Sequence, residues 1–348
     1  RLVEAFAFLA GRIRLKLDDE FPEMTESFLS VIYPHFLAPV PSMAVTQFIS
    51  GNPKSKDTTI QKIDRGSKLY SRPIEGSRCR FRTAYDVNLV PVEVLDAGLE
   101  SIAPPNAQGV LTDCQIRIKM RGFGGGALSE MVDAESEEPL EKLRFYLNGD
   151  PQLVFPLYEL IFNNVSHVEI QAKETPIEGS AMETITNIML SLPDPVILDK
   201  DVIQQVGFDE SDAILPYTRK SFPGYRLLTE YFAFPYKFLF FDVGGFGQAG
   251  RKGFGSDFVL VIHLKDVTPP KAPIEKETFV LGCTPVVNLF NRTADPIYLS
   301  QQRYEYQVFP DVHQQSATEI YTIGEVFTTD SITNKTREFF PYYSTCLL

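Results

Sequence analysis

CQIRIKMR, residues 114–121, is the stretch of this 348-residue sequence that decides its fold class. The apolar side chains of Cys114, Ile116, Ile118 and Met120 alternate there with polar and cationic ones. Successive side chains of a β-strand point to opposite faces of a sheet. A period of two therefore predicts a strand with one apolar and one cationic face.

Further strand patterns lie on both sides of this segment. Residues 238–241 and 258–264 are apolar at every position or nearly so, as expected of strands buried on both faces. Cys79 and Phe81 alternate with arginines, and residues 303–308 repeat that alternation with tyrosines. The sequence beyond residue 42 therefore predicts mainly β structure.

The N-terminus has a helical period instead. Leu2, Phe6, Leu9 and Ile13 recur at steps of four, three and four, which places them on one stripe of a helix that runs to about residue 17. Further apolar residues widen this stripe. A helix with so wide an apolar surface is expected to contact more than one neighbour.

A second helix is expected at residues 22–33. Pro22 suits the first turn of a helix, Phe28 and Ile32 share one face, and Pro34 would end the helix. The same periodicity predicts two shorter helices, at residues 152–163 and 225–234.

Aromatic residues are frequent, with 27 Phe and 15 Tyr but no Trp, so the core must use phenylalanine. We assign the cluster of Tyr231, Phe232, Phe234 and Tyr236 to the core and not to an interface, because large aromatic side chains are usually buried.

These patterns predict an α+β fold, a β-rich multidomain protein with a helical N-terminal segment. The length allows two or three domains. We divide the chain into an N-terminal helical segment at 1–41, a first β-rich domain at 42–142, a middle α+β domain at 143–222 and a β-rich domain at 223–348.

Composition excludes several classes of function. The chain has 33 basic and 45 acidic side chains, a net charge of −12, which argues against binding to nucleic acid because phosphates need clustered cations. Residues 27–53 carry no charge, but prolines would break a helix there, so we predict no membrane insertion. Four widely spaced cysteines predict reduced thiols in a cytoplasmic protein.

No motif predicts catalysis. GFGQAG at 245–250 fits a dinucleotide-binding pattern, but we interpret this glycine-rich segment as a flexible hairpin connection without the required helix. His35, His167, His263 and His313 stand far apart, so each is interpreted as a single structural or surface histidine. We predict no catalytic residue, no cofactor and no metal site.

Five long blocks, in order along the chain, carry a resemblance to a known family. They are RLVEAFAFLAGRIRLKLDDEFPEMTESFLSVIYPHFLAPVPSM at 1–43, CRFRTAYDVNLVPVEV at 79–94, LRFYLNGD at 143–150, FPGYRLLTEYFAFPYKFLFF at 222–241 and LGCTPVVNLF at 281–290. Together they resemble TssF, a baseplate subunit family of the bacterial type VI secretion system. Members of that family are longer at both ends, so we expect this chain to be an excerpt of a longer protein.

The resemblance implies a non-enzymatic scaffold. TssF-like subunits pair as two copies around one TssG to build a baseplate wedge, together with TssK and TssE. The wedges surround the VgrG hub and form the platform for sheath and tube assembly. We therefore expect a cytoplasmic subunit, held at the inner face of the cell envelope through the secretion complex, with TssG, a second TssF copy, TssK, TssE and the VgrG hub as partners.

Leu2, Phe6, Leu9 and Ile13 are the candidate partner-binding residues. We expect this stripe to pack against TssG or a second TssF copy, and the alternative is packing on the chain's own second helix around Phe28. Two other functions stay open. One is a wedge protein of a phage or phage-like contractile tail, and the other is a β-rich carbohydrate-active enzyme with a cleft of aromatics and two facing carboxylates.

Overall fold

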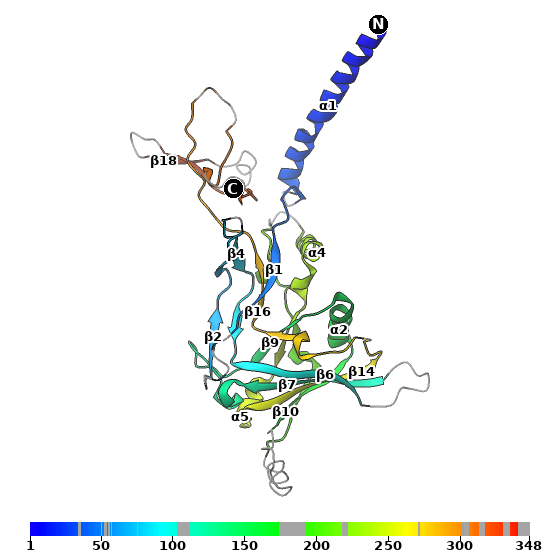
Figure 1. Cartoon of the computed structure of the whole chain (residues 1–348), viewed down its shortest axis with the longest axis vertical. Helices are drawn as coiled ribbons and strands as arrows, with labels where there is room; N and C mark the ends of the chain where they lie inside the picture. Colours follow the sequence, from blue (N-terminus) through cyan, green and yellow to red (C-terminus); the bar gives the residue numbers. More distant parts are fainter. Residues whose placement is uncertain are drawn as a thin grey trace.

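The computed structural model describes residues 1–33, 36–49, 51, 54, 56, 58–74, 76–102, 112–173, 192–217, 222–270, 272–300, 302, 306–312, 317–329 and 335–339. Several antiparallel sheets form the body of the molecule, and one long helix projects from it (Figure 1). This arrangement confirms the predicted β-rich α+β fold with a helical N-terminal segment.

Helix α1, Leu2–Ile32, is one continuous helix of 31 residues. At about 1.5 Å per residue it is about 46 Å long. The predicted division into two helices is therefore wrong, because the helix continues through residues 18–21 and through Pro22. A proline removes one backbone hydrogen bond, but no glycine accompanies it there, and the residues on both sides favour helix.

The largest sheet contains the predicted strand. Its order is β11-β10-β14-β7-β6, and all neighbours are antiparallel. The bounds are β11 Val196–Asp199, β10 Val165–Ala172, β14 Asp257–Val267, β7 Thr112–Gly122 and β6 Val92–Ser101. Every second side chain of β7 is buried, and Ile116 and Ile118 are 0% exposed. The alternation and the buried central strand at 258–264 are thus confirmed, with His263 the less buried exception.

A second sheet holds the aromatic part of the core. Its order is β12-β13-β9-β15, with β12 Ile203–Gln205, β13 Phe240–Gly244, β9 Lys142–Leu147 and β15 Phe279–Leu281. The ring centroid of Phe145 lies 5.5 Å from that of Phe241 and 6.3 Å from that of Phe279. The strand predicted from residue 238 begins at Phe240, because residues 235–238 form a 3₁₀ turn.

Smaller sheets connect distant parts of the chain. The sheet β1-β16-β4-β3 comprises β1 Met43–Gln47, β16 Cys283–Val287, β4 Arg80–Thr83 and β3 Lys68–Tyr70. The sheet β5-β2-β8 comprises β5 Val87–Leu89, β2 Thr59–Ile63 and β8 Val132–Asp133, and β17 Val326–Thr329 pairs with β18 Thr336–Phe339. Since β1 pairs with β16, with Ala44 opposite Val286, the base of α1 is tied to the body through a long-range pair.

The strand predicted at 303–308 is not found in its described part. Residues 306–308 lie outside any strand, and residues 303–305 lie outside the described residues. An alternating pattern forms a strand only where a neighbouring strand accepts its backbone hydrogen bonds, and no sheet of the described residues includes 306–308.

Among the shorter α-helices of the described residues, two were predicted. They are α2 Pro151–Asn163 and α4 Pro223–Ala233, and α5 Phe246–Arg251 is the third. Asp150 caps α2, because its Oδ1 accepts the backbone N–H of Gln152 at 2.8 Å. Pro156 lies inside α2 on its exposed side, while Val154 and Leu157 are fully buried.

Helix α5 corrects the prediction of a flexible hairpin connection in the glycine-rich segment. Gly245 has φ +93°, and a Cβ there would lie 2.2 Å from the Leu198 side chain. A Cβ on Gly247 would lie 2.4 Å from the Glu141 carboxylate. The glycines therefore allow close packing at a short turn, and a carboxylate occupies the space that a nucleotide phosphate would need.

The sheets combine strands from the proposed domains. The largest sheet takes β6 and β7 from 42–142, β10 and β11 from 143–222 and β14 from 223–348. The borders after residues 41, 142 and 222 stay a prediction. A division after residue 142 or after residue 222 separates strands that share a sheet, whereas the described part of residues 1–41 contributes no strand.

Candidate functional site

The α1 stripe (Leu2, Phe6, Leu9 and Ile13) is exposed. Leu2 is 90%, Phe6 72%, Leu9 57% and Ile13 55% accessible, and every other side chain of residues 1–16 is exposed as well. Figure 1 shows why: this part of α1 projects away from the sheets. The sequence pattern thus identified a real apolar surface that the described chain does not cover.

The alternative of packing on the chain's own second helix is wrong. Phe28 and Ile32 belong to the same continuous helix as the α1 stripe and are themselves exposed, at 64% and 69%. Residues of one straight helix that lie about five turns apart cannot touch each other.

The C-terminal end of α1 rests on α4. Backbone N–H of Tyr33 bonds to the carbonyl of Leu29 at 2.7 Å and closes the helix. The Tyr33 ring meets the Tyr225 ring of α4 edge to face, with centroids 6.3 Å apart, and its hydroxyl lies 3.5 Å from Oγ1 of Thr229. These contacts join the projecting helix to the body.

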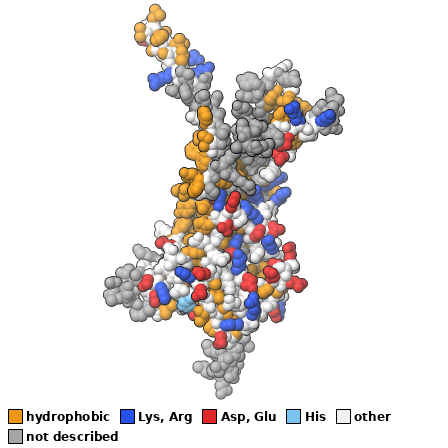
Figure 2. Space-filling view, turned by 180° about the vertical axis from the view of Figure 1, so that it is seen from behind, with side chains coloured by type: hydrophobic (Ala, Val, Ile, Leu, Met, Phe, Trp, Pro, Cys, Tyr) orange, Lys and Arg blue, Asp and Glu red, His pale blue; other side chains and the backbone are white. Residues whose placement is uncertain are grey.

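Helix α4 turns large apolar side chains outward. Its exposed residues are Phe222, Tyr225, Leu228, Tyr231 and Phe232. In Figure 2, hydrophobic side chains gather along the part of the molecule that leads from α1 towards the sheets. We call these five residues the α4 surface.

The assignment of the four-aromatic cluster to the core is only half correct. Phe234 and Tyr236 are partly buried and pack against the core, but Tyr231 is exposed and Phe232 is 81% accessible. The reason lies on the inner side of α4, where charged residues occupy the buried positions and leave only the outer side for the apolar ones.

Glu230 is the centre of this buried charged network. Its carboxylate accepts the backbone N–H groups of Ile214 and Leu215 at 2.8 and 3.0 Å, and it forms ion pairs with Arg226 and Lys237. Burial lowers the pKa of Lys237, although the contact with Glu230 opposes that effect. The network fixes α4, and with it the end of α1, on the body.

A cavity of about 210 Å³ lies between β2, β9 and β13. Its two carboxylates are both ion-paired: Asp86 lies 3.5 Å from Lys62 Nζ, and Asp242 lies 2.7 Å from Arg144 Nε and 2.8 Å from Lys142 Nζ. None of the described residues lining it is aromatic. It therefore does not match the cleft expected of a carbohydrate-active enzyme.

Asp242 is the buried member of these pairs. Burial alone would raise the pKa of Asp242, but the hydrogen bonds and charges of Arg144 and Lys142 outweigh it and lower that pKa. The carboxylate is thus held ionised in the interior, as buried charges are when they are paired and hydrogen-bonded.

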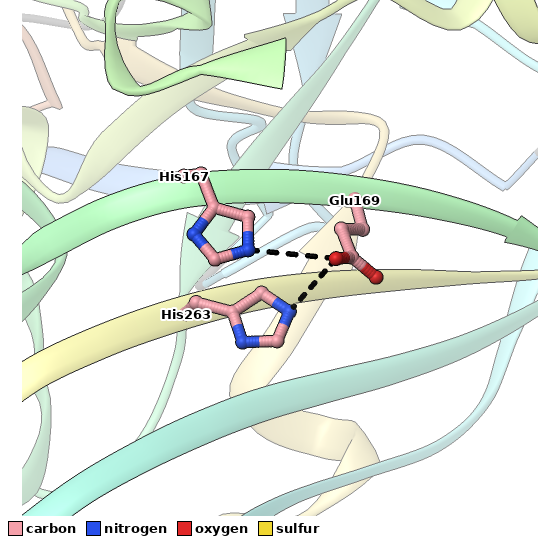
Figure 3. A group of neighbouring side chains, drawn as sticks. All are labelled: His167, Glu169 and His263. Atoms are coloured by element: carbon pink, nitrogen blue, oxygen red, sulfur yellow. Dashed lines mark ion pairs between the residues drawn. The ribbon is translucent and has the colours of Figure 1, made fainter. Parts of the chain in front are cut away.

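Two histidines that stand apart in the sequence meet on the largest sheet. His167 of β10 lies opposite His263 of β14 in the strand register, and their rings stack at 4.1 Å between centroids and 7° between planes. Figure 3 shows both rings beside Glu169. The interpretation of His167 and His263 as single, separate histidines is therefore wrong. The register of β10 against β14 brings them together.

Glu169 lies against both imidazoles. Its Oε1 is 3.4 Å from Nε2 of His167 and 3.6 Å from Nε2 of His263. Burial lowers the pKa of His263, and the neighbouring His167 lowers it further. Burial alone would raise the pKa of Glu169, but the hydrogen bond from Gln171 and the two imidazoles outweigh it and lower that pKa. Within the described residues this is the group suited to hold a metal ion.

Comparison with known proteins shows the family to which the chain belongs. The family model for "Type VI secretion system, TssF" matches residues 1–346. The chain belongs to the TssF family. A curated TssF relative, "Type VI secretion system component TssF1" of Pseudomonas aeruginosa, is 32% identical over 339 residues, which are 94% of this chain and 50% of that protein.

A solved structure agrees with this TssF assignment. It is a cryo-electron microscopy structure of the type VI secretion system TssK-TssF-TssG baseplate subcomplex, one chain of which matches with a TM-score of 0.72 and 26% identity. The match covers 99% of this chain and 59% of that chain, so the present chain spans about half of the relatives it matches. The resemblance is confirmed, and the phage-tail and carbohydrate-enzyme alternatives are not favoured.

In the described part of the chain, no helix combines the length and apolar character needed to cross a membrane. Helix α1 is long, but charged residues such as Arg12, Arg14 and Lys16 interrupt its apolar surface.

Proposed function

We propose that this chain is a structural scaffold subunit of a type VI secretion baseplate wedge, without catalytic activity, and that the α1 stripe binds TssG. The observation that carries the proposal is the exposure of the α1 stripe in a chain of the TssF family. Support for TssG as the partner comes from the matched structure, which is a subcomplex of TssF with TssK and TssG.

The spacing of the α1 stripe suits a helical partner. Steps of four, three and four place its side chains along one seam, as in the contact positions of a helix bundle. Burial of a large apolar side chain stabilises a complex by about 1.5–3 kcal/mol. Four such side chains on one projecting helix would contribute about 6–12 kcal/mol, against which the cost of association must be set.

The remaining partners belong to the same proposal. A second TssF copy, TssK, TssE and the VgrG hub complete the wedge around this subunit, in the cytoplasm at the inner face of the cell envelope. The second TssF copy is the alternative occupant of the α1 stripe. The α4 surface, next to the end of α1, extends the apolar area available to these partners.

A double substitution tests the interface. Phe6→Asp with Leu9→Asp places two charges in the seam, and at about 2 kcal/mol for each contact residue the affinity for TssG should fall about a thousandfold. The measurement is co-purification of tagged TssG with the variant, followed by a binding titration. Circular dichroism and thermal unfolding show whether the variant is folded.

The same helix offers a matched control. Ala7→Asp with Gly11→Asp adds the same charge to the opposite side of α1, where a Cβ on Gly11 meets nothing within 4 Å. This variant should bind TssG as the unmodified chain does. If the Phe6 and Leu9 variant is folded and still retains TssG at full affinity, the proposed contact is wrong. Loss of self-association with retained TssG would assign the stripe to the second TssF copy.

A further inference from the structure

The cluster of His167, Glu169 and His263 has a role that scaffolding does not explain. All three side chains stand on one face of the largest sheet, from the neighbouring strands β10 and β14 (Figure 3). The opposite face is core, where Val168 and Ile262 are 0% exposed. Glu169 and His263 are each only 18% accessible, so the cluster is partly withdrawn from solvent.

Ser166 orients the ring of His167. Its hydroxyl lies 2.9 Å from Nδ1 of His167 and 3.3 Å from the carbonyl of His263. In the tautomer in which Nδ1–H donates to this hydroxyl, Nε2 of His167 carries a lone pair that faces Glu169.

Three electron-pair donors thus face one another. Nε2 of His263 is buried and makes no hydrogen bond within the described structure, and it lies 3.6 Å from the same Glu169 oxygen that faces His167. The ligating atoms of all three residues lie within 4.8 Å of one another. Such an arrangement needs a positive charge between the donors, supplied by a proton or by a metal ion.

The distances suit a metal ion of tetrahedral preference. Zinc bonds to imidazole nitrogen and carboxylate oxygen are about 2.0–2.2 Å long, so ligand atoms in a tetrahedral site lie about 3.3–3.6 Å apart. The separations of 3.4 and 3.6 Å between Glu169 and the two nitrogens match this spacing. One imidazole must rotate out of the 7° stack when the ion binds, so that the lone pairs of both rings point at it. We propose that His167, Glu169 and His263 bind one Zn²⁺ ion, with the fourth position open to water.

Neighbouring residues orient the ligands in the way metal sites require. Ser166 holds Nδ1 of His167, and Gln171 donates to Oε2 of Glu169 at 2.8 Å, which leaves Oε1 directed at the histidines. Arg117 on β7 opposes a further positive charge at His263, and its Nε lies 3.8 Å from Glu100, which offsets its charge. Zinc here would clamp β10 to β14 and stabilise the folded chain by mass action.

A direct binding measurement tests this site. The purified full chain, stripped of metal by a chelator and dialysed, is titrated with ZnCl₂ against a chromophoric zinc chelator. We expect one ion per chain, and an affinity that falls about tenfold or more in Glu169→Gln and in His263→Gln. Thermal unfolding with and without Zn²⁺ should show stabilisation of the unmodified chain and none in these variants.

Control variants keep the result unambiguous. Glu93→Gln removes a carboxylate from β6 of the same sheet, in register with Arg121 and not with the positions of the cluster, and should leave zinc binding unchanged. Cobalt(II) in place of zinc should give the intense visible absorption of a tetrahedral site. Absence of stoichiometric binding to the unmodified chain overturns the proposal, as does equal binding by a His167→Gln, His263→Gln double variant. Either result is independent of TssG binding, so it leaves the scaffold function untouched.

Discussion

Strand β7 and helix α1 carry similar apolar side chains with opposite outcomes. In β7 the apolar residues alternate with charged ones and are fully buried, because β6 and β14 pair on both sides and the core covers one face. In α1 the apolar residues form an equally regular stripe and stay exposed. Residue type alone therefore does not decide whether a side chain is buried. Burial also requires that the same chain supply a surface against which the side chain can pack.

This difference separates folding from binding. Apolar side chains inside the sheet stabilise the chain itself, and those on α1 can stabilise only a complex. Substitutions in the first group should change the unfolding free energy, and those in the second should change affinity alone.

Ile118→Asp should cause the largest loss of stability. The side chain is 0% exposed in the centre of the largest sheet, so a carboxylate there is buried without a partner, and a cost of about 5 kcal/mol or more is expected. Urea unfolding followed by circular dichroism measures it. Arg117→Gln, on the other face of the same strand, serves as the control and should change stability little. A stable, soluble Ile118→Asp chain would contradict the assigned core.

Glu230→Gln should cause the second largest loss of stability. The change leaves Arg226 and Lys237 buried without their counter-charge, and removal of one partner from a buried ion pair costs about 3–5 kcal/mol. Because the network fixes α4, the end of α1 should also lose its support. Chemical unfolding tests the first effect, and Glu159→Gln on exposed α2 surface is the control. Equal stability of the two variants would show that the network is dispensable.

Asp242→Asn should change how stability depends on pH. The pKa of Asp242 lies below its ordinary value of 3.8 in the folded chain, so its stabilisation is complete above that value and is lost as pH falls through the folded pKa. The variant should be about 2 kcal/mol less stable at neutral pH and should lose less on acidification below about pH 4. Unfolding curves at pH 7 and pH 3 measure both effects. Parallel pH profiles of stability for the variant and the unmodified chain would refute the assigned ion pairs. Asp201→Asn, at an exposed position, is the control.

Phe6→Ala should change stability least of all. The side chain is 72% exposed, so the unfolding free energy should change by less than about 0.5 kcal/mol. Its affinity for TssG should nevertheless fall about thirtyfold, as for a contact residue worth about 2 kcal/mol. Calorimetric unfolding and a TssG titration on the same sample give both values. A clear loss of stability would mean that α1 packs on its own chain.

Local patterns predicted the elements that depend on local sequence. The alternation at 114–121 gave β7, the apolar run at 258–264 gave β14, and helical spacing gave the α1 stripe. The predicted helix break at residues 18–21 failed because an acidic segment and one proline were taken as sufficient to end a helix. In α1 neither does so, because the helix loses only the backbone hydrogen bond of Pro22 and the residues on both sides favour helix.

The wrong predictions about the histidines concerned contacts between residues that are distant in the sequence. His167 and His263 meet only through the register of β10 against β14, which a single sequence does not reveal, although the pair His167 and Glu169 on one strand face was a visible signal. The exposure of the apolar side of α4 could also have been predicted from the local sequence. Arg226 and Glu230, four residues apart, share one side of the helix and leave the other side to Tyr231 and Phe232.

Amide hydrogen exchange of the chain alone and after addition of TssG tests the separation of folding from binding most directly. Without TssG, amides of β7 should exchange slowly and those of residues 2–16 in α1 quickly. With TssG, exchange in residues 2–16 should slow by at least tenfold while β7 stays unchanged. If a complex forms and residues 2–16 exchange as fast as before, the exposed stripe of α1 is not the surface that holds the baseplate together.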